Sequence, residues 1–349
     1  FNYYGLPIDV TSSATNSDLL NRADRETNQV NQTIAANIGF ESKEDAPFGY
    51  LLDLGYINFS HKYGLGKPAD GPTEHTFDAK FDLNAGFNGN MRIGLGGQVE
   101  YFNYSLPGKK ETISGTYYTY EFENHAEVIL SPYYKVEGDS WNLKLGANVM
   151  LVTGDNSKFM ASPNIAADIE VADKTLLYLN AGGKLYSNSM YETSLVNRYV
   201  NPTKEIAPSR NWLDATLGIK SGVAPGFDVF AGYKITSSDV LFLPSRIYDR
   251  DHFGNFSEAM SDIDTKQLFI GANLKYSYQQ LFDVSLKGVY NNWKANFGDT
   301  WIGGEANGEL AHAWGKPEME VTAGLTVRPV KNVSVLLDYY LATGRYTQL

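Results

Sequence analysis

The sequence predicts an all-β protein: a transmembrane, antiparallel, up-and-down β-barrel of at least about 14 strands, or about 16–22 if its ends are incomplete. Two observations predict this fold. Apolar and polar residues alternate along many segments of about ten residues, and the connections between these segments are alternately short and long. A soluble sandwich also alternates, but its strands average about five or six residues and its connections show no such parity.

The clearest hairpin runs from Phe77 to Tyr101. Along 77–87 the odd positions are apolar or aromatic and the even positions are mostly polar, and 91–101 repeats this pattern on the return. Gly89-Asn90 supplies the two-residue turn that joins antiparallel strands. One face of the hairpin is therefore apolar, while the other carries both signs of charge. A barrel hairpin has this pattern, with its apolar face toward lipid and its polar face toward the lumen.

The other strands are expected from the same alternation. Their ranges are about 34–40, 50–56, 122–136, 141–149, 165–171, 177–185, 213–219, 229–235, 268–276, 282–290, 319–327 and 333–341. Residues 1–10 are interpreted as the end of a strand, and 188–209 and 237–264 as long non-periodic loops. The region 296–318 has two interpretations, a loop or a further strand at Gly304–Trp314. The loop is preferred because it keeps the order of turns regular.

The connections indicate which end of the strands faces which side of the membrane. Short turns are expected at Lys43, Gly89, Gly138, Asp173, Pro225, Gln279 and Lys331. Longer loops lie between them. Short periplasmic turns and long extracellular loops are typical of outer-membrane barrels, so the predicted location is the bacterial outer membrane.

Composition agrees with this class and excludes others. The chain has 349 residues, a formal net charge of -11, 33 Gly, 24 Tyr and no Cys. The absence of Cys excludes disulfides and thiolate zinc sites, and the negative charge argues against a nucleic-acid partner. No apolar run reaches the roughly 18–20 residues of a membrane-spanning helix. Because no linker interrupts the pattern, residues 1–349 are expected to form a single barrel domain, truncated at both ends.

The polar face supplies the candidate lumen-lining residues. They can contact a plug, steer a solute or form a selective wall, or they can simply form a hydrated wall of ion pairs. Both interpretations stay open, and the second is favoured. The residues are Asp78, Lys80, Asp82, Arg92, Glu100, Lys144, Asp168, Lys220, Lys234, Lys287 and Arg328.

No catalytic constellation or cofactor motif stands out, so the chain is not expected to be an enzyme. The five His residues form no i, i+4 pair, and Ser209, Ser245 and Ser257 lack a nucleophile-elbow context. Asp249 and Asp251, in the densest acidic loop, could supply oxygen ligands to calcium. Their spacing does not match an EF-hand, so a solvated acidic loop is favoured and no metal site is predicted.

Several short motifs resemble the barrel of TonB-dependent receptors over about residues 30–349. Ser162-Pro163-Asn164-Ile165 leads into 176–183, and Asn201-Pro202 and Ala207-Pro208-Ser209 precede 213–218. Arg210 departs from the family's pattern, which usually has Glu or Ser there. Trp314-Gly315-Lys316-Pro317 before a strand, and 339–345 after it, are similar to receptor-like barrels of Bacteroidetes.

The resemblance implies a large monomeric barrel that imports a bulky nutrient across the outer membrane. An N-terminal plug and a TonB box normally accompany such barrels, and neither is found in this sequence. The alternative is a plugless relative that acts as a structural or assembly subunit. A lipase- or protease-like barrel enzyme is a distant third, because no Ser/His/Asp or paired acidic residues are recognised at a barrel rim.

Partners and ligand contacts follow from this resemblance. The partners would be outer-membrane lipid and lipopolysaccharide, a surface lipoprotein or other outer-membrane subunits, and TonB only if a plug lies upstream. The long loops would contact the ligand through aromatic and polar side chains. The candidates are Tyr191, Tyr199, Tyr248, His252, Phe253 and Trp301.

Overall fold

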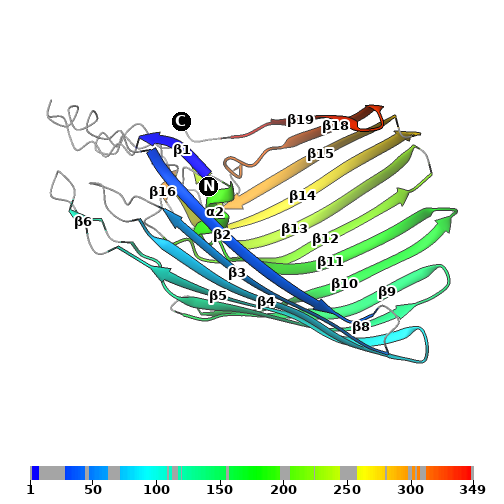
Figure 1. Cartoon of the computed structure of the whole chain (residues 1–349), viewed down its shortest axis with the longest axis horizontal. Coiled ribbons are helices and arrows are strands. Elements are labelled where there is room, and N and C mark those ends of the chain that lie inside the picture. Colours follow the sequence, from blue (N-terminus) through cyan, green and yellow to red (C-terminus); the bar gives the residue numbers. More distant parts are fainter. Residues whose placement is uncertain are drawn as a thin grey trace.

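A computed structural model shows one large antiparallel sheet whose strands follow one another in chain order (Figure 1). It describes residues 2–7, 28–43, 47–61, 71–107, 110–111, 117–118, 120–154, 157–196, 205–223, 225–243, 258–279, 281–297, 301–302, 305–306 and 312–346. The sheet has 15 strands, 14 of them long and preceded by the six-residue β1. This order confirms the predicted all-β, up-and-down fold. No helix among the described residues is long and apolar enough to span a membrane.

The elements have the following bounds. The main sheet contains β1 (Asn2–Pro7), β2 (Asn28–Glu41), β3 (Phe48–His61), β4 (Thr73–Phe87), β5 (Met91–Ser105), β8 (His125–Glu137), β9 (Trp141–Val152), β10 (Lys158–Ala172), β11 (Thr175–Tyr186), β12 (Ser209–Ser221), β13 (Gly226–Leu243), β14 (Glu258–Tyr278), β15 (Phe282–Asn296), β18 (Met319–Val330) and β19 (Val333–Thr343). Outside it lie helix α2 (Met190–Val196) and two small ladders. These ladders are β6 (Lys110–Glu111) with β7 (Tyr117–Tyr118), and β16 (Trp301–Ile302) with β17 (Glu305–Ala306).

The seven short turns fall where the sequence predicts them, each between two paired strands. The β4–β5 turn lies at the predicted place but is one residue longer than the predicted Gly89-Asn90 turn, since Phe87 pairs with Met91 across Asn88–Asn90; Asn88 and Gly89 have positive φ angles of 51° and 75°. The loop interpretation of 296–318 is also correct, because β15 pairs directly with β18, and the described residues between them form no strand of the main sheet but the small β16–β17 ladder.

Two stretches that the sequence analysis treated as loops contain more regular structure than expected. Helix α2 lies within 188–209, and β13 and β14 extend into 237–264, where Asp239 pairs with Ile263. Ser238 has a φ of 53° and the register shifts between Thr236 and Asp239. This irregularity interrupts the alternation of faces while the backbone pairing continues, so the periodic pattern ends before the strands do.

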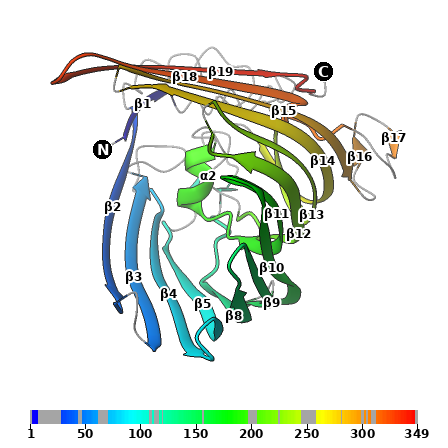
Figure 2. The ribbon, with the colours of Figure 1, turned by 90° about the vertical axis from the view of Figure 1, so that its right-hand side faces the viewer.

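The two faces of the sheet differ in polarity. Glu74 on β4 contacts α2, which lies on the concave side of the sheet (Figure 2), so the even positions of β4 face inward. The odd positions face outward and remain exposed: Leu83 is 42% exposed, and on other strands Leu217 is 54% and Leu286 45% exposed. An apolar surface spread over so many strands is unusual for a water-soluble monomer and typical of the lipid-facing side of a barrel.

Gly183 occupies a bulge in β11, where the pairing with β12 shifts register between Gly182 and Lys184. A Cβ atom at Gly183 would lie 2.4 Å from the carbonyl oxygen of Asn211 and 2.7 Å from the Cβ of Ser162. At Gly182 the nearest atom would be the Pro163 carbonyl oxygen at 3.8 Å. The two adjacent glycines therefore differ in the space that they leave for a side chain.

We expect Gly183→Ala to lower the free energy of unfolding by about 1–3 kcal/mol, because the added methyl group overpacks the bulge. Gly182→Ala is the matched control and should change it by less than about 1 kcal/mol, since its methyl group meets open space. Urea unfolding of the full-length protein in lipid vesicles, followed by tryptophan fluorescence, measures both. Equal effects at the two positions would contradict this account of the bulge.

Candidate functional site

Helix α2 lies on the concave side of the sheet (Figure 2), toward the long-loop ends of the strands (Figure 1). The sequence Ser189-Met190-Tyr191-Glu192 has the Ser-x-x-Glu spacing of a capping box. Ser189 Oγ accepts the backbone N–H of Glu192 at 3.2 Å, and Glu192 accepts the backbone N–H of Ser189 in return. Met190 and Thr193 are buried against the wall. The local sequence therefore starts this short helix, and contacts with the sheet hold it in place.

The first turn of α2 is anchored by Glu74, which lies at the long-loop end of β4, beyond the outward apolar band that begins at Phe77. Glu74 is 0% exposed, and its Oε2 accepts the N–H of Met190 at 2.6 Å and of Tyr191 at 3.3 Å. Thr76 Oγ1 donates to Oε1 at 3.1 Å. Burial raises the pKa of Glu74, although these hydrogen bonds oppose the shift. A carboxylate at a helix N-terminus satisfies N–H groups that have no partner within the helix.

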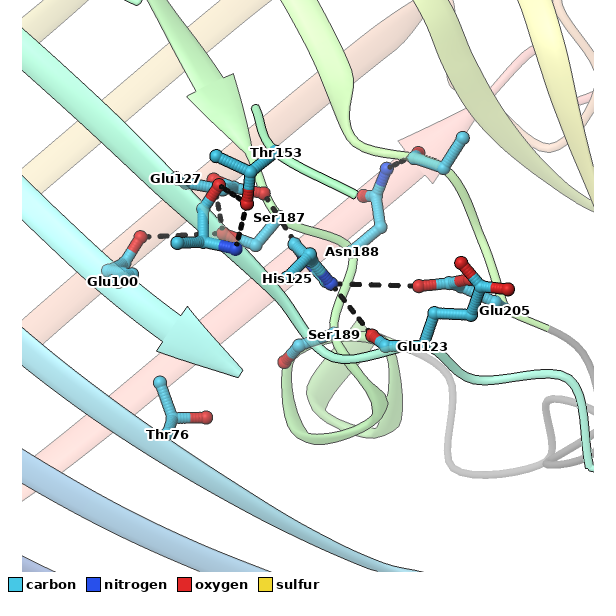
Figure 3. Close-up of polar contacts among 12 residues, drawn as sticks. Thr76, Glu100, Glu123, His125, Glu127, Thr153, Ser187, Asn188, Ser189 and Glu205 are labelled. Carbon is cyan, nitrogen blue, oxygen red and sulfur yellow. Dashed lines mark hydrogen bonds and ion pairs between the residues drawn. The ribbon is translucent and has the colours of Figure 1, made fainter. Parts of the chain in front are cut away.

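A second set of contacts joins the loop on both sides of α2 to the adjacent wall (Figure 3). Ser187 Oγ donates to Glu127 Oε2 at 3.0 Å and lies 3.5 Å from Glu100 Oε2. His125 Nδ1 lies 3.1 Å from the Glu123 carbonyl oxygen and 3.7 Å from Glu205 Oε1. Glu74, Glu100, His125, Glu127 and Ser187 are called the inner polar cluster below.

The inner polar cluster is rich in negative charge. In the sheet register Asp78 is directly opposite Glu100, and Glu100 is directly opposite Glu127. Carboxylates placed opposite one another on neighbouring strands repel, so a bound proton or cation stabilises the arrangement. Burial lowers the pKa of His125, but Glu127, the Glu123 carbonyl and Glu205 raise it by more, so it ends above its ordinary value.

Two cavities border the inner surface. A small one of ≈ 10 Å³ lies beside His125, lined also by Glu123, Glu205 and Thr153. A larger one of ≈ 410 Å³ lies near the short-turn end, and its lining includes Lys174, Lys220, Lys275 and Asp228. No group of three or more His, Asp or Glu side chains among the described residues is arranged to hold a metal ion.

The structure places all eleven predicted lumen-lining residues on the concave face. The register runs across the wall through pairs such as Asp82–Gly96, Asp168–Tyr178 and Asp228–Asn273 without changing face. Several of the eleven form hydrogen bonds or ion pairs with other polar side chains of the concave face. Tyr133 donates to Asp82 at 2.8 Å, Arg92 to Asn84 at 2.8 Å, Lys234 to Tyr186 at 2.7 Å and Arg328 to Asp283 at 2.6 Å, while Lys80 lies 3.4 Å from Asp78.

Of the predicted ligand contacts, Tyr191 is described in full. It is the second residue of α2, after Met190, and its ring lies 5.6 Å from that of Phe59 on β3. Trp301 is placed as backbone in β16. The others lie outside the described residues, as do the calcium candidates: they are Tyr199, Tyr248, His252, Phe253, Asp249 and Asp251.

Sequence reasoning missed Glu74, His125, Glu127 and Ser187 as members of a site. Glu74 and Glu127 have the same residue type and the same alternation as other wall residues, so nothing in their own strands distinguishes them. The capping-box spacing at Ser189 was the one available signal that the loop folds into a helix.

The fold defines the class of structure: an up-and-down antiparallel wall of the outer-membrane β-barrel type, curved, with a loop folded against its concave face. No family model matches the sequence, and no curated protein matches it. Solved structures do match it in fold, and these structures are transporters and receptors.

Three of the matching structures illustrate this likeness. A ferric enterobactin receptor (PfeA) mutant from Pseudomonas aeruginosa, in complex with enterobactin, has a TM-score of 0.59 and 11% identity, covering 96% of this chain and 53% of its own. Copper transporter OprC has a TM-score of 0.56 and 11% identity, and the match covers 87% of this chain and 52% of OprC. The siderophore receptor PirA from Pseudomonas aeruginosa has a TM-score of 0.55 and 10% identity, and the match covers 88% of this chain and 53% of PirA. The chain therefore spans about half the length of these structures.

Proposed function

We propose that this chain forms part of a TonB-dependent receptor in the outer membrane of a bacterium, with its exposed apolar face toward lipid. The observation that carries the proposal is the separation of faces over 14 long strands: apolar and exposed outside, charged and occupied by α2 inside. The fold likeness to the copper transporter and the siderophore receptors supports it. The chain would be a single domain within a wall that further strands close, since β1 and β19 form the two edges of the described sheet and are not paired with each other.

The transported substrate would be a bulky nutrient, and the role would be uptake rather than catalysis. The matching structures are described as a copper transporter and receptors for siderophores, so a chelated metal is the first class to test. Tyr191 and the other aromatic candidates of the long loops would contact it. TonB would be the energy-coupling partner, lipopolysaccharide would contact the outward face, and a surface lipoprotein would be a further partner. Membership of Bacteroidetes is part of the same proposal.

Uptake in the native bacterium tests this function. Cells that lack the gene, cells that lack TonB and unmodified cells are compared for accumulation of ⁵⁵Fe-enterobactin and ⁶⁴Cu²⁺, and the full-length protein is traced in membrane fractions. We expect to find the protein in the outer-membrane fraction. We also expect saturable uptake of one of the two probes to be lost both in cells that lack the gene and in cells that lack TonB. Unchanged uptake together with stoichiometric co-purification of other outer-membrane proteins would favour the plugless structural subunit instead.

A further inference from the structure

Two buried polar atoms of the inner polar cluster face each other without a hydrogen-bond partner. They are Nε2 of His125 and Oε1 of Glu127, whose residues are 7% and 2% exposed; they lie 3.7 Å apart, which makes them an ion pair when the imidazole is protonated but not a hydrogen bond (Figure 3). Buried polar atoms are rarely left without a partner, because that costs roughly 1–3 kcal/mol each. We propose that His125 and Glu127 bind a divalent transition-metal ion of the Zn²⁺, Ni²⁺ and Cu²⁺ class between these two atoms.

The spacing suits a shared metal ion better than a direct hydrogen bond. Imidazole nitrogen and carboxylate oxygen bind Zn²⁺ at about 2.0–2.2 Å, so two such ligands at a tetrahedral angle lie about 3.4 Å apart. The observed 3.7 Å is within a few tenths of an ångström of that separation and is too long for a hydrogen bond. A small closing movement of either side chain completes the site.

The contacts behind both residues orient them as metal ligands. His125 Nδ1 lies 3.1 Å from the Glu123 carbonyl oxygen, an acceptor, so Nδ1 carries a hydrogen and Nε2 points toward Glu127, where a bound metal ion replaces any proton on Nε2. Ser187 Oγ donates to the other carboxylate oxygen of Glu127 at 3.0 Å, which leaves Oε1 free. Histidine and carboxylate ligands of metals are commonly held by such outer contacts.

The surrounding charge selects the kind of ion. Glu100 is directly opposite Glu127, Asp78 is opposite Glu100, and Glu205 Oε1 lies 3.7 Å from His125 Nδ1, so the setting favours a cation. A ligand pair of one imidazole and one carboxylate favours borderline transition metals over Ca²⁺ and Mg²⁺, which take oxygen ligands. Since no group of three such side chains among the described residues is arranged to hold one metal ion, water would fill the remaining positions and binding would be weaker than at a three- or four-residue centre.

Titration of the purified full-length protein in detergent with Zn²⁺, in buffer that contains excess Mg²⁺ and Ca²⁺, tests the proposal by calorimetry. One saturable site is expected. His125→Gln and Glu127→Gln should each raise its dissociation constant at least about tenfold, and Ser187→Ala by about tenfold, as for outer-contact residues of known metal sites. His75→Gln is the matched control, because His75 bonds to Tyr56 on the outward face and should leave binding unchanged.

A spectroscopic readout keeps the test decisive if a variant fails to fold. Cu²⁺ bound to the unsubstituted protein should give an electron paramagnetic resonance spectrum with coupling to one imidazole nitrogen, and Zn²⁺ should displace it. The absence of a saturable site, equal weakening by His75→Gln, or a spectrum without imidazole coupling would overturn the proposal. This binding is measured without transport, so its outcome is independent of the proposed uptake function.

Discussion

Leu83→Arg is expected to lower the free energy of unfolding of the membrane-inserted protein by about 2–4 kcal/mol. Leu83 lies in the middle of β4 on the outward face and is 42% exposed there. If this face meets hydrocarbon, an arginine near the bilayer midplane must be desolvated or must distort the membrane, and penalties of this size follow. On a face that meets water the same change would be nearly neutral, so the effect separates the two environments.

Lys80→Ala is the matched control for Leu83→Arg on the same strand. Lys80 faces inward, lies 3.4 Å from Asp78 and is half exposed, so the loss of this ion pair should change stability by less than about 1 kcal/mol. Urea unfolding of both variants in phosphatidylcholine vesicles measures the difference. Comparable penalties at the two positions would count against a lipid-facing outer surface.

Glu74→Ala is expected to release α2 from the wall. It should lower the free energy of local opening of the helix by about 2–3 kcal/mol. The substitution removes the acceptor of the Met190 and Tyr191 N–H groups and opens a cavity, and hydrogen bonds to a charged group contribute about 1.5–3 kcal/mol. Amide hydrogen exchange of the peptide 187–196, read by mass spectrometry, should accelerate roughly 30-fold or more.

The control for Glu74→Ala is Glu137→Ala. Glu137 ends β8 at the short-turn side, where it pairs with Lys135 at the surface, far from α2 in the register of the sheet. Exchange of 187–196 should be unchanged in this variant. If Glu74→Ala also leaves it unchanged, the carboxylate does not anchor the helix and the description of the site is wrong.

Much of the sheet could be predicted from the sequence because its physics is local. Alternation along 77–87 and a turn at Gly89-Asn90 are determined by neighbouring residues, and the same two signals recur for every long strand. The strand ends were harder, because a positive φ at Ser238 shifts the faces of β13 while its backbone pairing continues.

The inner polar cluster could not be predicted from the sequence, because its contacts are distant in the chain. Glu74 bonds to Met190, 116 residues away, and Ser187 to Glu127, 60 residues away. Which of many similar glutamates meets a given loop depends on how that loop crosses the concave face. The capping box at Ser189 predicts a helix start but not its position. The eleven inward residues followed from periodicity alone, and their role as a lumen surface stays a proposal.

Nitroxide scanning of β4 tests directly whether the apolar face of the sheet points toward lipid. The chain has no Cys, so single cysteines at positions 78–85 of the full-length protein can be spin-labelled one at a time in lipid vesicles. Collisions with oxygen, which dissolves in lipid, should peak at 79, 81, 83 and 85, and collisions with a water-soluble nickel complex at 78, 80, 82 and 84. The opposite phase, with labels at the odd positions reached by the nickel complex, would contradict the central claim.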